Sequence, residues 1–73
     1  MRFIINFGYT SRRGFVKQSE CSFVCNGDVD SAVDMMCVKF EDWMNRNPSK
    51  AKRRTAQLYL DGMIIKIKHC DCQ

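Results

Sequence analysis

The chain has 73 residues, of which 45% are hydrophobic and 27% charged, and its formal net charge is +4. This length fits one small domain, 1–73, with one core, and the apolar content excludes a disordered chain. No apolar run approaches the roughly 18 residues of a membrane-spanning helix and the N-terminus has no signal-peptide pattern, so the sequence predicts a cytoplasmic protein.

Apolar and polar residues alternate in the N-terminal segment, a pattern typical of a half-buried strand. One side of this strand carries Phe3, Ile5, Phe7 and Tyr9. Turn residues 10–14 end it, and a second strand is expected over residues 15–25. The inward residues of that strand would be Phe15, Cys21, Phe23 and Cys25. Because Lys17 and Ser19 interrupt the apolar series, we expect a bulge or bend there.

A helix is predicted after the turn at residues 26–28, where Asp28 is a good N-cap residue. Apolar residues then recur at spacings of three and four, which makes one buried stripe. The stripe consists of Val29, Val33, Met36, Cys37, Phe40, Trp43 and Met44. Asn47 should end the helix, because a residue that precedes proline is pushed out of the α region.

The strongest local signal is Asp61-Gly62 between two alternating segments, 55–60 and 63–68. Asp-Gly in this setting predicts a hairpin with a two-residue type I′ turn. The implied register pairs apolar residues on the inner face, Leu60 with Met63, Leu58 with Ile65 and Ala56 with Ile67. The outer face of the hairpin would carry Tyr59, Lys66 and Lys68.

The predicted element order is β-β-α-β-β, which is an α+β fold in two layers. We expect a four-stranded sheet with one helix packed on one face. A helical connection between the second and third strands makes them run in the same direction. The turn at 10–14, the loop at 45–54 and the C-terminal tail then meet at one end of the sheet. Residues 25–28 and the turn at 61–62 meet at the other.

Charge follows this division of the fold. The first end gathers a set of cations that we call the basic pole: Arg12, Arg13, Arg46, Lys50, Lys52, Arg53 and Arg54. The opposite end gathers Asp28, Asp30, Asp34 and Asp61. Such a concentration of positive charge predicts a binding surface for phosphates or for an acidic protein patch.

The sequence predicts neither an enzyme nor a cofactor site. There is one histidine, the adjacent Glu41 and Asp42 point in different directions on a helix, and the glycines are too scattered to cradle a phosphate. The five cysteines are expected to be thiols. Cys25 would lie roughly 17–20 Å from Cys70 and Cys72, too far for one zinc ion. No metal site is therefore predicted. A site of His69, Cys70 and Cys72, within one chain or shared across a dimer, is the open alternative.

In size and β-β-α-β-β plan the chain resembles the small proteins that bacteriophages encode to inhibit host machinery, such as anti-CRISPR proteins. The resemblance rests on architecture and not on any motif. It implies a non-enzymatic inhibitor that docks on a host protein or nucleoprotein complex, and the basic pole is the candidate partner-binding surface. The alternative is a small regulator that binds DNA or RNA directly. The open sheet face and the edge strands are further candidate interfaces, including one for a homodimer.

Overall fold

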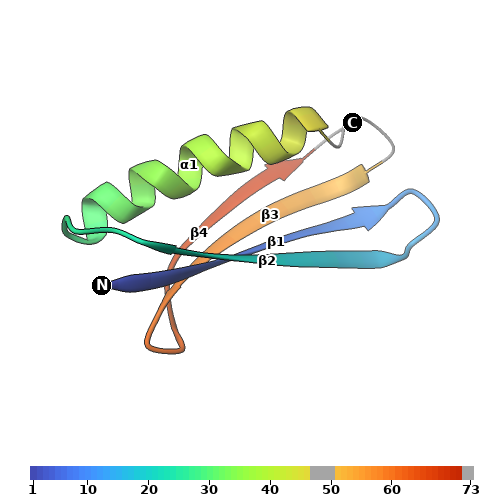
Figure 1. The fold of residues 1–73 in the computed structure, drawn as a ribbon. Helices are drawn as coiled ribbons and strands as arrows, with labels where there is room; N and C mark the ends of the chain where they lie inside the picture. The colour runs from blue at the N-terminus through green and yellow to red at the C-terminus, as the bar shows by residue number, and fades with distance from the viewer. Residues whose placement is uncertain (47–50, 72–73) are drawn as a thin grey trace.

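A computed structural model describes residues 1–46 and 51–71, with the side chains of 51, 52 and 71 outside the description. The elements in chain order are β1 (Arg2–Ser11), β2 (Val16–Val24), α1 (Val29–Arg46), β3 (Ala51–Leu60) and β4 (Met63–Asp71). Figure 1 shows the helix lying across one face of the strands. The predicted β-β-α-β-β order is confirmed.

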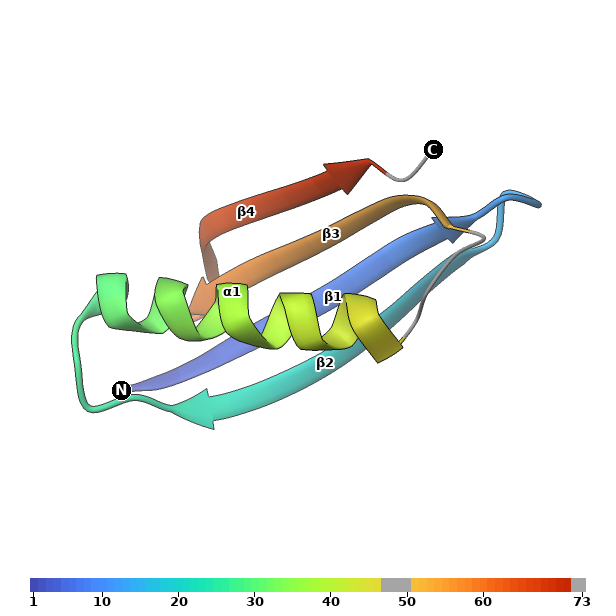
Figure 2. The same cartoon turned by 90° about the horizontal axis from the view of Figure 1, so that it is seen from above.

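The four strands form one sheet in the order β2-β1-β3-β4. β1 is antiparallel to both β2 and β3, and β3 is antiparallel to β4. β2 and β3 therefore run in the same direction, as predicted, although β1 lies between them. Seen from above, α1 runs along the sheet on one side only (Figure 2). The predicted α+β class, a four-stranded sheet with one helix on one face, is confirmed.

The core lies between α1 and the two central strands. β1 contributes Phe3, Ile5 and Phe7, β3 contributes Ala56 and Leu58, and α1 contributes Ala32, Met36 and Phe40. Stacked aromatic rings extend this core toward the end of the helix, with ring centroids 5.2 Å apart for Phe7 and Trp43 and 6.1 Å for Phe40 and Trp43. The inward side predicted for the first strand and most of the predicted helix stripe are thus confirmed.

β2 differs from its prediction. Its pairing with β1 is unbroken from Val24 to Val16, so the expected bulge is absent, and Phe15 lies before the strand and is 65% exposed. Lys17 and Ser19 lie in phase with half-buried Cys21 and Phe23 but are exposed. The reason is coverage, because α1 packs mainly on β1 and β3 and leaves this part of the edge strand open. Polar residues can therefore occupy the helix side of the sheet without a bulge.

The second hairpin has the predicted turn, because Asp61 and Gly62 both adopt positive φ angles of 54° and 78°. The predicted pair Leu60–Met63 forms, and Tyr59 pairs with Ile64 beside it. The register then shifts between Leu58 and Tyr59.

Beyond that shift, the predicted register of the second hairpin is wrong. Leu58 pairs with Lys66, and Ala56 with Lys68, so Ile65 is the extra residue of a bulge. Ile65 packs against the core. One inserted residue reverses the faces that follow, because side chains alternate along a strand. Lys66 and Lys68 consequently leave the open face on which they were predicted.

The helix begins as predicted. The backbone N–H of Ser31 donates to Asp28 Oδ1 at 3.0 Å, which satisfies one of the free amides of the first turn. This hydrogen bond, together with one from the Ser31 side chain, lowers the pKa of the Asp28 carboxyl. α1 ends at Arg46, and the predicted stop at Asn47 lies outside the described residues.

We predict that Asp28→Ala destabilises the fold and that Asp28→Asn retains most of the capping contribution at neutral pH. A lowered pKa in the folded state means that the charged form adds stability above the unfolded pKa near 4, and that this part is lost as pH falls through the folded pKa. Urea unfolding from pH 7 to pH 2 should therefore show the advantage of the wild type over Asp28→Asn shrinking in acid. A constant difference would contradict this assignment.

Candidate partner-binding site

The turn between β1 and β2, the end of α1, the start of β3 and the end of β4 meet at one end of the molecule (Figure 1). Two strand pairs document this meeting, because Ser11 pairs with Ala51 and Arg53 pairs with Asp71. The segment that leads into α1 and the Asp61-Gly62 turn lie at the other end (Figure 1). The topology therefore brings the described members of the basic pole to one end and Asp28, Asp30 and Asp61 to the opposite end.

Arg54 belongs to the core and not to the exposed surface of the basic pole. Its residue is only 5% exposed, and its Nη1 donates to the Met44 carbonyl oxygen at 3.1 Å. β3 alternates, so Arg54 shares the helix side with buried Ala56 and Leu58. The guanidinium meets the carbonyl end of α1, where the helix dipole favours a positive charge. A residue predicted to bind a partner instead attaches the helix to the sheet.

Two other cations of the basic pole have partners within the chain. Arg46 Nη2 lies 2.9 Å from Asp42 Oδ2 in an exposed ion pair one helical turn apart. Arg53 is on the open side of β3, where its Nη2 lies 3.0 Å from His69 Nδ1. Both remain exposed and can exchange these weak surface contacts for a partner's groups. Lys50 and the side chain of Lys52 lie outside the described residues.

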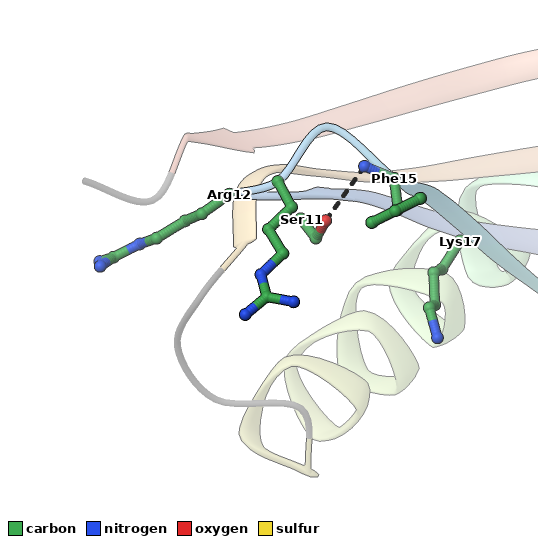
Figure 3. A pocket seen from close by; sticks show the side chains of 5 residues that line it. Ser11, Arg12, Phe15 and Lys17 are labelled. Carbon is green, nitrogen blue, oxygen red and sulfur yellow. Dashed lines mark hydrogen bonds between the residues drawn. The ribbon is translucent and has the colours of Figure 1, made fainter.

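The β1–β2 turn presents Arg12 and Arg13. The turn is closed by backbone hydrogen bonds from Ser11 N to Phe15 O at 2.8 Å and from Gly14 N to Ser11 O at 2.9 Å. Ser11 Oγ also accepts the Phe15 N–H at 3.1 Å, and Gly14 adopts a φ of 89°. Figure 3 shows this closed turn with its side chains spread around it. Both arginines are exposed, and neither forms an ion pair with another described residue.

A shallow hollow at this turn is lined by Ser11, Arg12, Arg13, Phe15 and Lys17 (Figure 3). Its lining combines three cations with one exposed aromatic ring and includes no carboxylate. Sequence reasoning missed Phe15 and Lys17, because it assigned Phe15 to the core side of a covered strand. The signal that could have found them is the glycine before Phe15, which places this ring at the edge of a turn. The hollow is suited to an anion with an adjacent apolar or aromatic group.

The described thiols and carboxylates form no larger cluster. Within residues 1–46 and 51–70, no group of three or more His, Cys, Asp or Glu side chains could hold a metal ion. Cys21, Cys25, Cys37 and Cys70 are free thiols, and Cys72 of the alternative site lies outside the described residues. The same ranges contain no helix with both the length and the apolar character that crossing a membrane requires.

No protein-family model, curated protein or solved structure matches this chain. The functional argument therefore rests on the residues of the site.

We predict that Arg54→Ala lowers the free energy of unfolding by about 2 kcal/mol, because it removes both a buried hydrogen bond and the packing of the side-chain stem. Urea unfolding followed by circular dichroism measures the loss. The matched control is Arg53→Ala, one residue earlier on the exposed side of β3, which should change stability by less than about 0.5 kcal/mol. Equal losses in the two variants would contradict the assignment of Arg54 to the scaffold.

Proposed function

We propose that this chain is a non-enzymatic binding protein that docks, through the exposed part of its basic pole, on an acidic surface of a host protein or nucleoprotein complex. In this proposal it acts in the host cytoplasm as a small inhibitor of the anti-CRISPR type. The observation that supports it most directly is the pair Arg12 and Arg13, exposed on a hydrogen-bonded turn and without a carboxylate partner among the described residues.

Three physical features favour docking at this turn. The hydrogen bonds within the turn hold the backbone in one shape before binding, which reduces the entropy lost on association. Guanidinium groups form bidentate hydrogen bonds with carboxylates and phosphates. The position of Asp28, Asp30 and Asp61 at the far end of the molecule orients the approach to an anionic surface, since complementary charge steers encounter.

The test is a double charge reversal, Arg12→Glu with Arg13→Glu, used with the wild type in a tagged pull-down from bacterial lysate. The matched control is Arg2→Glu with Lys66→Glu, which reverses two exposed cations outside the basic pole. Both double variants lower the formal net charge from +4 to 0. We expect a specific protein to be recovered by the wild type and the control, and to bind the turn variant at least ~10-fold more weakly.

Circular dichroism of each variant confirms that it is folded before the binding data are compared. Recovery of the same partner by the Arg12→Glu, Arg13→Glu variant as by the wild type would remove the turn from the mechanism. If recovery of the partner disappears after nuclease treatment of the lysate, the ligand of the basic pole is nucleic acid and the proposed docking on a protein surface is wrong.

Direct binding of single-stranded DNA or RNA is the second candidate function, and the exposed ring of Phe15 is what favours it. Proteins that bind single strands combine cations along the phosphates with aromatic rings on which bases stack. Phe15 is 65% exposed and lines one hollow with Arg12, Arg13 and Lys17. The arrangement can accept one base and the phosphates beside it.

We predict for this second function that Phe15→Ala weakens binding to a fluorescent oligothymidylate by about 5- to 150-fold, the equivalent of a stacking loss of ~1–3 kcal/mol. With three phosphates contacted, affinity should fall ~20-fold between 50 and 200 mM salt. Fluorescence anisotropy measures both effects, and Val16→Ala, an exposed apolar neighbour on the open side, is the control. An affinity that changes neither with salt concentration nor in the Phe15→Ala variant would exclude this function.

A further inference from the structure

The two edges of the sheet are protected to different degrees. β4 has a bulge at Ile65 and carries Lys66 and Lys68. Both bulges and lysines hinder pairing with another strand. β2 has an unbroken register over its nine residues and carries one lysine, Lys17, where β4 carries two. Like β4, it has few contacts with α1, which packs mainly on β1 and β3. The edge of β2 is therefore the one at which a further strand can add.

The hydrogen bonds at the two ends of the first hairpin establish which backbone groups of β2 point outward. At the turn, Ser11 N donates to Phe15 O. At the other end, Cys25 N donates to Met1 O and Met1 N donates to Cys25 O, at 3.0 and 3.1 Å. Bonding alternates along an antiparallel strand. The odd-numbered residues from 15 to 25 are thus bonded to β1, and residues 16, 18, 20, 22 and 24 direct their N–H and C=O groups to the free edge.

We propose that the strand added here is β2 of a second copy of this chain, antiparallel to the first, with the two-fold axis at Ser19. Phe15 then lies opposite Phe23 of the second copy, and Lys17 lies opposite Cys21 of the second copy. On the open face, Gln18 lies opposite Glu20 of the second copy. Each of these pairs occurs twice by symmetry, and no like charges face one another.

Exposure and charge select this register. Phe15 is 65% exposed and Phe23 is half-buried, both on the helix side of the sheet, so pairing them covers apolar surface that the single chain leaves open. An axis at Glu20 would pair more residues, but it would set Glu20 against its own copy, and like charges directly opposite each other are destabilising. An axis at Cys21 would carry Phe15 beyond the end of the opposing strand. The axis at Ser19 pairs both rings without a charge conflict.

The resulting dimer has a simple geometry. A two-fold axis perpendicular to the sheet keeps both helices on one side and joins the two sheets edge to edge. The isologous contact uses the same strand twice, as closed dimers do. Arg12 and Arg13 lie beyond the paired segment in both copies, so this inference goes beyond the proposed function and does not depend on it.

The first experiment removes one outward N–H. In Gln18→Pro the ring occupies a position whose N–H points to the free edge, so the bonding of β2 to β1 is retained while the intermolecular ladder loses a donor. Gln18→Thr is the control, because it keeps the N–H. Sedimentation velocity over a range of concentrations should show dimers for the wild type and for Gln18→Thr, and monomers for folded Gln18→Pro. A wild type that stays monomeric at its highest soluble concentration overturns the proposal.

The second experiment tests the register. At a two-fold axis on Ser19 the two Ser19 residues form a non-hydrogen-bonded pair with Cα atoms about 4.5 Å apart, within the range of a disulfide. Ser19→Cys should therefore form a linked dimer under mild oxidation. Ser22→Cys, also exposed on β2, should not, because its two copies would lie ~20 Å apart along the strands.

Mass spectrometry of the digested, unreduced dimer identifies the linked peptides, with the wild type as the baseline for the native thiols. A link through the thiol introduced at position 19 supports the register. Linkage through native Cys21, or equal linkage in the Ser19→Cys and Ser22→Cys variants, overturns it.

Discussion

The contact between the Arg54 guanidinium and the Met44 carbonyl is the interaction on which the basic end of this molecule depends. It joins the last turn of α1 to β3 at the place where the aromatic stack of Phe7, Phe40 and Trp43 packs the helix onto β1. A buried cation is costly unless polar groups surround it, and the carbonyl end of a helix supplies such groups. The neighbouring Arg53, on the other side of the strand, is left exposed. Alternation along β3 thus divides one run of cations between the scaffold and the surface.

The bulge in β4 has a comparable effect on the open face. Because Ile65 is inserted, Ile67 and His69 lie on the open side and the two lysines do not. His69 can then contact Arg53, and the open face becomes less positive than an unbroken hairpin would make it. The same irregularity protects this edge of the sheet, whereas the regular pairing of β2 leaves the other edge available. A single inserted residue therefore affects both the charge of a face and the difference between the two edges.

The parts of the fold that were predictable from the sequence are those specified by local chemistry. Asp61-Gly62 defines its turn and Asp28 its helix start because each signal acts within a few residues. The bulge at Ile65 was not predictable, since alternation favours the unbroken register, whereas the observed one sets Leu58 and Ala56 opposite Lys66 and Lys68. The burial of Arg54 was not predictable, because this residue belongs to a run of cations that is typical of a solvated loop. Phe15 was misplaced because hydrophobicity alone does not show how far a helix extends over an edge strand.

Phe15 links the candidate binding site to the candidate dimer contact. It lines the hollow beside Arg12 and Arg13, and it also lies at the end of the edge formed by β2. A ring that pairs with Phe23 of a second copy cannot at the same time stack on a nucleic-acid base. The two arginines would stay exposed in such a dimer, because they lie beyond the paired segment. Dimerisation through β2 would therefore favour docking on an anionic surface through guanidinium groups over recognition of unstacked bases. The two candidate functions become alternatives, and whether β2 is paired with a second copy decides between them.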